Sequence, residues 1–304
     1  VASAQVELDL SASGGVLSSD LINVDGDMDI TDATVVPNFV GDGFEAGQSF
    51  QLISSTNPLI GTFVNQADTF VLTNYAFLEA IEDVSYQPNG FGLLIRDNGE
   101  SFTSFAEGCN QLSAATLLDA LQAGPSPPAS VTDLRNGTVE EVTLAYNQLS
   151  GSIYPSLVGA EINHIQNNLE SVRNRADFLF CSQPGEWMLT PWARGYGVSA
   201  QVSEDDCRTL GYRQEIGGVE LGCGLNFGCQ FTAYTFAHLA SGSLNLRGAD
   251  QRAEVDSYRI GGLVGYLGHH AYLVAAGGAG TQDYSVRRSL SAFEGSTYAR
   301  SSFD

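Results

Sequence analysis

The feature that most constrains this chain is a series of long strand-like segments in its last third. After Glu186, five segments of about 12 to 14 residues follow one another, each rich in Gly and aromatic residues. They cover residues 187–198, 209–222, 229–240, 255–267 and 271–284, and a sixth begins near Thr297. Soluble strands average about five or six residues, whereas a tilted strand needs about 9–11 to cross a bilayer. The pattern therefore favours a transmembrane β-barrel over a soluble antiparallel sheet.

The connections between these segments are predicted to alternate in length. Those after the first, third and fifth strands are long and polar, and residues 241–254 are one of them. Those after the second and fourth, residues 223–228 and 268–270, are short. Long loops on one side and tight turns on the other are typical of outer-membrane barrels.

The fourth segment predicts which side chains face lipid. Tyr258, Ile260, Val264 and Tyr266 share one face of the strand, with aromatic residues at both ends. We expect this face to contact lipid and Arg259, on the other face, to point into the lumen. The fifth segment is ambiguous, because Gly277-Gly278 interrupts its alternation.

The charge of the chain excludes nucleic acid as a partner. Its 304 residues contain 35 Asp and Glu but only 13 basic residues, for a net charge of −22, and every basic residue is Arg. A polyanion without a basic run gains nothing by releasing counterions from a phosphate backbone. A hydrophobic content of 43% also excludes wholesale disorder.

Residues 1–105 are predicted to consist of short strands and turns. β-rich runs are separated by Gly, Asn, Asp and Pro, which fits a sandwich or a stacked β-solenoid. The clearest runs are Gln5–Leu10, Asp20–Val24, Ser49–Ile53 and Gly90–Ile95. Propensity alone does not separate the two architectures.

One loop in this region resembles a calcium-binding loop. Carboxylate and amide oxygens recur at alternate positions around Gly26, at Asn23, Asp25, Asp27, Asp29 and Asp32. Leu21 stands where the first carboxylate belongs, and no helical pattern flanks the loop. The alternative, which these departures favour, is a strand with outward-facing carboxylates beside a glycine turn.

Residues 106–186 are predicted to be helical. Apolar residues recur every three or four positions from Leu112, and helices are expected over residues 112–121, about 130–149 and about 155–180. The third has one narrow apolar stripe among polar side chains and reaches about 37 Å. Such a helix crosses a bilayer only inside a water-filled pore. The alternative is a surface helix packed by its stripe.

Motifs along nearly the whole chain resemble those of the autotransporter family. The similarity extends over the end of the β-helix, the segment before the linker helix and the barrel strands. The matching segments are Ser19–Val35 with Gly43–Ile53 and Gly61–Phe63, then Asn147–Leu157, then Pro191–Gly197, Tyr212–Gly222 and Tyr258–Tyr266 with His270–Tyr272. Ser152 replaces the Glu that the family has at that position.

The resemblance implies a mainly β chain in three parts. Residues 1–105 would be the C-terminal β-helix rungs of a passenger, and residues 106–186 a helical linker whose helix traverses the pore. Residues 187–304 would be the N-terminal half of an antiparallel transmembrane β-barrel that is incomplete, with about 5–6 of the family's twelve strands. We therefore expect both ends of the chain to lie within a longer protein.

The resemblance also implies a function. The chain would belong to a bacterial outer-membrane translocator (type V secretion) that secretes or displays its own N-terminal passenger at the cell surface. Expected partners are outer-membrane lipid, the passenger itself, the barrel-assembly machinery and periplasmic chaperones, with no cofactor. Arg173 and Arg175 would face the lumen and pair with wall carboxylates such as Glu215.

One subgroup of the family cuts its own passenger free at an Asn-Asn pair in the linker helix. Asn167-Asn168 matches that motif, and the first amide would attack its own backbone carbonyl. The subgroup's helper acid would fall at Val274, which has no carboxylate. The alternative is that both Asn residues simply keep the helix polar.

Other chemistry is sparse, so we do not expect an enzyme. The chain has no G-x-S-x-G, H-E-x-x-H or C-x-x-C motif. A β-helical carbohydrate-binding or carbohydrate-active surface protein with a membrane anchor remains the alternative function, although residues 1–105 hold a single basic residue, Arg96. The pairing of the five cysteines is open, and Cys223 and Cys229 flank a predicted hairpin turn.

Overall fold

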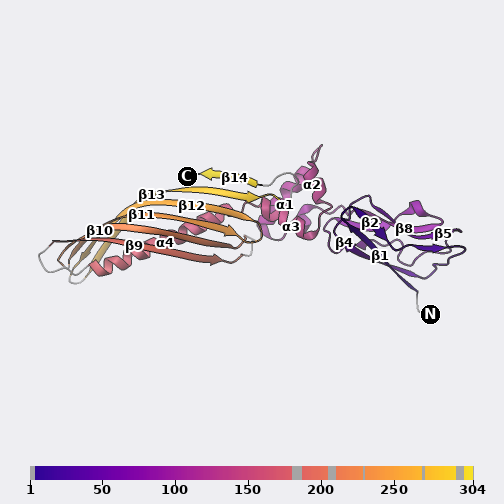
Figure 1. Cartoon of the computed structure of the whole chain (residues 1–304), viewed down its shortest axis with the longest axis horizontal. Helices are drawn as coiled ribbons and strands as arrows, with labels where there is room; N and C mark the ends of the chain where they lie inside the picture. The colour runs from indigo at the N-terminus through magenta and orange to yellow at the C-terminus, as the bar shows by residue number, and fades with distance from the viewer. Residues whose placement is uncertain are drawn as a thin grey trace. The chain divides into compact units, whose positions relative to one another are not determined.

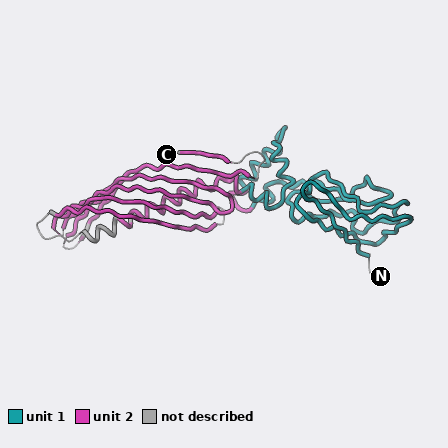
Figure 2. The backbone as a smooth tube through the Cα atoms, viewed as in Figure 1, with its two compact units in different colours: residues 1–106, 112–146, 292–294 teal, residues 107–111, 147–291, 295–304 magenta. Residues whose placement is uncertain are grey.

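The computed structural model describes residues 4–179, 187–204, 210–228, 230–268, 271–291 and 298–303. The chain divides into two compact units (Figure 2). The first holds the described residues of 1–106 and 112–146, and the second those of 107–111, 147–291 and 295–304.

The first unit contains two small sheets around one apolar core. The first sheet has the order β2-β1-β4 and the second the order β3-β5-β8-β7-β6. Their strands are β1 (Gln5–Ser13), β2 (Val16–Ser19), β3 (Ile22–Val24), β4 (Thr34–Gly41), β5 (Ser49–Ser55), β6 (Phe70–Val71), β7 (Leu78–Glu82) and β8 (Gly90–Asp97). Leu10, Val35, Leu52 and Leu93 are fully buried between the strands. The expected runs Gln5–Leu10, Ser49–Ile53 and Gly90–Ile95 are confirmed as strands, and of Asp20–Val24 only Ile22–Val24 is strand.

The first unit contains both parallel and antiparallel strand pairs. β1 pairs with β4, and β3 with β5, in parallel, and a parallel bridge joins Asp29 to Ile60. In each case the partners lie about 30 residues apart, the spacing of one repeat of a solenoid. β8 then pairs with β5 in antiparallel fashion, and β7 and β6 continue the antiparallel order.

One 3-10 turn lies between β7 and β8, and the other helices of this unit follow β8. η1 (Val84–Tyr86) and η2 (Phe102–Phe105) are short 3-10 turns, and α1 (Gly108–Gln122), α2 (Ala129–Leu134) and α3 (Val139–Leu149) are α-helical. The single helix predicted over residues 130–149 is wrong, because α2 ends before α3 begins. Thr138 starts α3 with a capping box: Glu141 Oε2 accepts from the Thr138 N–H at 2.8 Å, and Thr138 Oγ1 accepts from the Glu141 N–H at 3.3 Å.

The second unit is a six-stranded antiparallel sheet with one long helix, α4 (Ile153–Leu179), along one of its faces (Figure 1). Consecutive strands are neighbours in the order β14-β13-β12-β11-β10-β9. The strands are β9 (Trp187–Val202), β10 (Tyr212–Phe227), β11 (Phe231–Leu246), β12 (Gln251–Leu267), β13 (Tyr272–Ser289) and β14 (Tyr298–Phe303). Among the described residues, no helix combines the length and apolar character needed to span a membrane.

Most of these strands are longer than predicted, which corrects two expected connections. The predicted loop 241–254 is wrong, since β11 runs to Leu246, β12 starts at Gln251 and only residues 247–250 form the turn. The predicted turn 223–228 is likewise mostly strand, because β10 runs to Phe227. The connections after β9 and β13 (203–211 and 290–297) are longer than those after β10 and β12 (228–230 and 268–271), as expected, but the one after β11 is not.

The sheet is divided below into two halves along its cross-strand rows, the lines of residues that lie opposite one another on neighbouring strands. The rim half comprises residues 197–202, 212–217, 241–246, 251–256, 283–289 and 298–303. The belt half comprises residues 187–196, 218–227, 231–240, 257–267 and 272–282. The face that packs against α4 is called the inner face and the opposite face the outer face.

Candidate functional site

The inner face of the belt half is polar, whereas its outer face is apolar. Among the described residues, the outer face of this half carries no charged side chain, and Tyr258, Ile260, Val264 and Tyr266 on β12 are all at least half exposed. Charged and ionisable residues lie on the inner face instead, at Arg194, Glu220, His238 and Arg259. A sheet that exposes its apolar face and covers its polar one is suited to an apolar solvent.

The inner face of the rim half has the opposite character and forms an apolar core with the first turns of α4. Ile153, Leu157 and Ala160 on α4 are buried against Leu244 and Val255 on the sheet. The remaining members of this core are Leu210, Tyr212, Leu246, Ala249, Ala253 and Val286. This packing fixes the start of α4 against four neighbouring strands and turns.

Polar residues of the rim half also fix the chain just before α4. Arg288 donates to the carbonyl of Gln148 at 2.8 Å, and Gln251 donates to the carbonyls of Asn147 and Gln148, both at 3.3 Å. These carbonyls belong to the last turn of α3, which has no helical partners for them. A cation at this end of a helix is also favoured by the helix dipole.

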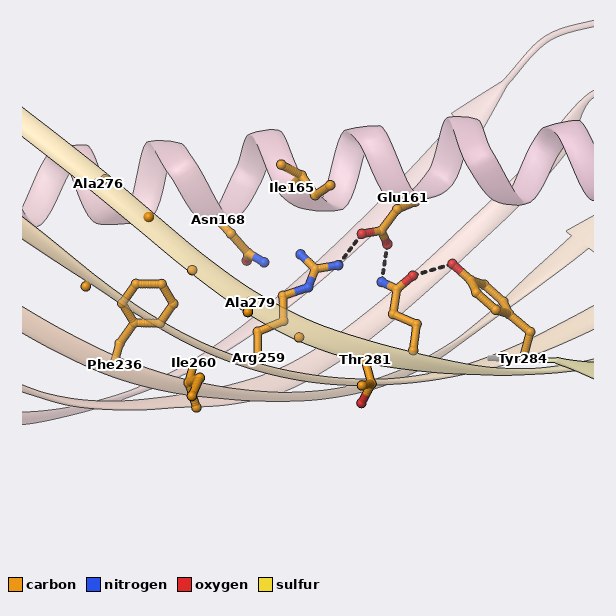
Figure 3. A pocket seen from close by; sticks show the side chains of 15 residues that line it. Glu161, Ile165, Asn168, Phe236, Arg259, Ile260, Ala276, Ala279, Thr281 and Tyr284 are labelled. Atoms are coloured by element: carbon orange, nitrogen blue, oxygen red, sulfur yellow. Dashed lines mark hydrogen bonds and ion pairs between the residues drawn. The ribbon is translucent and has the colours of Figure 1, made fainter.

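Further along α4, Glu161 forms a charged contact with the sheet (Figure 3). Its carboxylate accepts from Arg259 on β12 and from Gln282 on β13, while Tyr284 donates to the amide oxygen of Gln282. The Arg259 side chain is only 16% exposed. A carboxylate with two donors on two strands fixes both the rotation and the height of the helix.

Closer to the end of the helix, Glu220 on β10 is the centre of a buried polar network. Its Oε2 accepts from Ser171 Oγ on α4 at 3.1 Å, and its Oε1 lies 3.3 Å from His238 Nδ1. Arg194 on β9 donates to Ser171 Oγ and lies 3.9 Å from Glu220. Glu220 and His238 are almost fully buried.

Tyr196 connects this network to a second position on the helix. Its hydroxyl lies 2.6 Å from His238 Nε2 and 3.1 Å from His164 Nε2 on α4. The path from His164 through Tyr196 and His238 to Glu220 therefore begins on the helix, crosses three strands, and returns to the helix at Ser171. The hydrogen bonds of such a network favour one arrangement of the elements that contribute to it, although Nδ1 of His164 has no partner among the described residues.

A cavity of about 690 Å³ lies beside the Glu161–Arg259 pair. Its wall is made of small residues of β13, 276–280, together with Gly262 and Phe236. Asn168 and Ile165 reach it from α4 (Figure 3). The helix thus fills one part of the inner face and leaves another part open where the strand side chains are smallest.

Glycines on neighbouring strands allow aromatic side chains to lie flat on the inner face. A Cβ at Gly222 would come within 2.3 Å of the Trp192 ring, and one at Gly218 within 2.8 Å of the Tyr196 hydroxyl. Trp192 also stacks on Tyr234 at a centroid distance of 5.2 Å. Close approach, not a turn, explains the glycine spacing on β10.

The residues predicted to face the lumen have different outcomes. Arg259 lies on the inner face and binds Glu161, while the side chains of Arg173 and Arg175 lie outside the described residues. Their expected partner Glu215 is on the outer face, where it pairs with Arg213 at 2.6 Å. The inner carboxylate of that strand is Glu220.

The other predicted sites stay predictions. Asn167 is exposed on α4 and Asn168 lines the cavity, but the geometry adds nothing for self-cleavage. In the proposed calcium loop, Asp29 accepts from the Thr31 N–H at 2.9 Å and Asp27 from Asn57 at 2.8 Å. No group of three or more His, Cys, Asp or Glu that could hold a metal ion occurs in the described part of the chain.

The cysteines differ from one another. Cys109 is in a disulfide, and Cys223 is a free thiol on β10. The pairing of Cys223 with Cys229 is therefore not formed, and Cys229 itself lies outside the described residues.

Sequence reasoning missed most of the network. Glu161, His164, Tyr196, Glu220 and His238 were not singled out, although they are the polar contacts between α4 and the belt half. The signal in the sequence is Glu220, a charged residue among the glycines and apolar residues of β10. Its role can be recognised only when it is known which positions of the strand face inward.

The comparison with protein families agrees with this geometry. The family model described as "Autotransporter beta-domain" matches residues 191–304, which begin within β9 and cover the rest of the sheet. No curated protein and no solved structure matches the chain. Residues 191–304 therefore match an autotransporter β-domain, the outer-membrane β-barrel of type V secretion proteins.

Proposed function

We propose that this chain is the translocator of an autotransporter, with α4 inside the barrel lumen and the segment before it at the cell surface. The observation that carries the proposal is the opposite polarity of the two faces in the belt half. Its outer face is apolar, whereas its inner face holds Arg194, Glu220 and Arg259 against a polar helix. Lipid on the outside and a water-filled lumen inside satisfy both faces.

The contacts of α4 support its place in the lumen. Glu161, His164 and Ser171 lie on three successive parts of the helix, and each binds the inner face. Polar side chains buried in a lipid-exposed helix would lack partners, and here the sheet provides them. The helix thus marks the path that the translocated segment follows.

The first unit supports the passenger assignment. Two strand pairs and one bridge connect partners about 30 residues apart in parallel, as in successive turns of a β-helix. The antiparallel strands β6 to β8 would then end the stack and cover its last open edge at β5. Residues 1–105 are thus the end of a β-helical passenger in this proposal.

The proposal also assigns partners and location. The protein resides in the bacterial outer membrane with its passenger at the cell surface, and it is inserted by the barrel-assembly machinery after escort by periplasmic chaperones. The alternative of a carbohydrate-binding or carbohydrate-active protein has no support from the family match. No catalytic activity is assigned to the β-domain.

Cell fractionation tests the location. The full-length protein is expected in the outer-membrane fraction, where it should migrate differently on gels before and after heating because a folded barrel resists detergent. Recovery of folded full-length protein in the soluble fraction would contradict the proposal.

Cysteine crosslinking tests the place of α4. In the full-length protein with its native cysteines replaced, the pair Glu161→Cys and Arg259→Cys is expected to be joined by a short bifunctional maleimide in intact cells, since the native side chains are in contact across the gap between α4 and β12. The matched control is Glu161→Cys with Ile260→Cys, because Ile260 is the next residue and its side chain is on the outer face. Equal crosslinking of both pairs, or of neither, would be evidence against a lumenal helix.

A further inference from the structure

One cross-strand row on the outer face of the rim half is unusually cationic. Strand pairing places Arg252 opposite Arg287, and Arg287 opposite Arg300, on three adjacent strands. From Arg252 the same row continues through the other three strands, as Asn245, Arg213 and Gln201. Four of the chain's 13 arginines therefore lie in a single row, and all four are exposed.

This arrangement places like charges side by side, and a bound anion would relieve the repulsion between them. Residues directly opposite each other on antiparallel strands are about 5 Å apart, and like charges at that distance are destabilising. Arg213 and Arg252 have partners two positions away, Glu215 at 2.6 Å and Glu254 at 3.3 Å. Arg287 lies with its guanidinium 3.6 Å from the centre of the Tyr298 ring, a contact that leaves its charge in place.

The height of the row limits what the anion can be. Arg252 precedes Tyr258, the first residue of the apolar belt on β12, by six positions. At about 3.4 Å per residue and a tilt of about 40°, Arg252 stands about 15 Å above the hydrocarbon edge, and the row slopes by about 3 Å per strand from there. The head-group region of an ordinary phospholipid bilayer ends about 5–8 Å above that edge.

Acidic residues between the belt half and the arginine row also argue against an ordinary phospholipid as the source of the anion. Asp256 lies opposite Asp283 in the row next to the belt, and Glu254 lies two positions higher on β12. The two aspartates lie at the level of the phospholipid phosphates, so they repel phosphates there, and Glu254 lies between that level and the arginine row. The arginines lie farther from the membrane than these aspartates, so the surface favours phosphate groups that lie above the phospholipid head groups.

We propose that the arginine row binds the phosphate groups on the sugar portion of a large glycolipid in the surrounding outer leaflet. This inference rests on the proposed function, because it requires the belt half to lie in the membrane and the rim half outside the cell. Guanidinium groups bind phosphate in bidentate fashion, and three adjacent strands present them side by side. Sequence-distant arginines become one surface only through the strand register.

The test measures lipid retention by the full-length protein. The protein is reconstituted in phosphatidylcholine bilayers that contain one of four additives: lipopolysaccharide with a phosphorylated core, the same lipopolysaccharide after enzymatic dephosphorylation, lipid A, or phosphatidylglycerol. We expect retention of the phosphorylated form to fall by at least about tenfold in the variant Arg252→Gln, Arg287→Gln, Arg300→Gln. Arg96→Gln, an exposed arginine of the first unit, is the control and should retain it normally.

Thermal unfolding in the same bilayers provides a second measurement. In phosphatidylcholine alone the triple variant should be at least as stable as the wild type, since it lacks the opposed charges. With phosphorylated lipopolysaccharide the order should reverse. A merely structural role of the arginines would not change sign with the lipid.

Several results would overturn the proposal. These are equal retention by wild type and triple variant, equal retention of the dephosphorylated form, or retention of lipid A or phosphatidylglycerol as strong as that of the phosphorylated core. Row-dependent binding of polyglutamate without lipid preference would assign the row to an acidic protein instead. Failure to insert into phosphatidylcholine would overturn the proposed function, and this inference with it.

Discussion

The rim and belt halves of the same six strands have opposite polarity. In the belt half, Tyr258 and Ile260 lie outside and Arg259 lies inside. In the rim half, Arg252 and Glu254 lie outside, whereas the neighbouring inner residues belong to a buried apolar core. The strands run through both halves without interruption, and only the polarity of each face changes.

This difference shows that the surrounding medium, water or lipid, determines whether a given face of a strand carries charged or apolar side chains. The rim half follows the rule of a soluble sheet, with apolar residues facing a helix and charged residues facing water. The belt half follows the rule of a membrane barrel. A strand segment can therefore be assigned to water or lipid by the face on which its charges lie.

The largest expected effect comes from the apolar core of the rim half. Leu244→Ala should reduce the free energy of unfolding by about 2–5 kcal/mol, because it leaves a cavity between the sheet and α4. Leu239→Ala, on the outer face of the same strand, should cost less, because lipid fills the space. Unfolding of the full-length protein from bilayers measures both, and equal costs would break the comparison.

A charge on the outer face should matter only in the belt half. Ile260→Arg is expected to cost about 2–4 kcal/mol, since it places a cation in hydrocarbon. Ser285→Arg, on the outer face of the rim half, should be nearly neutral, because it faces water. The folded fraction on gels without heating reports both variants, and a costly Ser285→Arg would show that the membrane boundary lies higher.

The polar network should be more sensitive than the rim's surface carboxylates. Glu220→Gln removes the charge that Arg194, His238 and Ser171 share, and should cost about 1–3 kcal/mol. Glu254→Gln removes an exposed carboxylate of the rim half and should cost less than about 0.5 kcal/mol. Unfolding in bilayers compares them, and a neutral Glu220→Gln would mean that water already satisfies the network.

The ion pair between Asp97 and Arg135 in the first unit is a charged contact in water, with which the contacts of the belt half can be compared. Burial raises the pKa of Asp97, but hydrogen bonds from Arg135 and the Gly99 N–H outweigh it, so the pKa lies below its usual value. Arg135 also stacks on Phe77 at 4.6 Å. A carboxyl group whose pKa is lowered by folding stabilises the folded state at pH values above its unfolded-state pKa. This stabilisation is lost as the pH falls through the folded-state pKa.

Asp97→Asn should therefore destabilise the first unit near neutral pH, by no more than about 1 kcal/mol because the carboxylate is partly exposed. The difference from wild type should shrink below about pH 4. Hydrogen exchange of residues 78–97 in the full-length protein measures it, with Asp42→Asn as the control. A difference that is constant down to pH 2 would refute the ionic origin.

Local patterns were sufficient for several elements. The alternation around Tyr258–Tyr266 identified a strand with one lipid-suited face, and the apolar stripe after Pro155 predicted α4 within two residues at its start. These features depend on near neighbours in the chain, where the period of two or of three to four is visible. The helix break at Thr138 was also local, and its capping box with Glu141 was overlooked.

The rim half shows where local patterns mislead. Residues 241–254 are rich in Ser, Asn, Arg and Glu and were predicted to be a loop, yet most of them are strand. In the strand portions of this segment, Ser241, Ser243, Asn245, Arg252 and Glu254 occupy outer positions, whereas Leu244, Leu246, Gln251 and Ala253 occupy inner ones. A loop and a strand facing water have the same composition, so only pairing with β10 and β13 separates them.

The sequence by itself determined that this chain has membrane-length strands and a polar helix, because alternation and helical spacing are properties of consecutive residues. Only the tertiary structure decided which carboxylate meets the helix, Glu220 instead of the expected Glu215. The two lie five positions apart, so they occupy opposite faces of β10, and α4 covers one of them. Side chains alternate with a period of two, and the face that is covered depends on a helix that is distant in sequence.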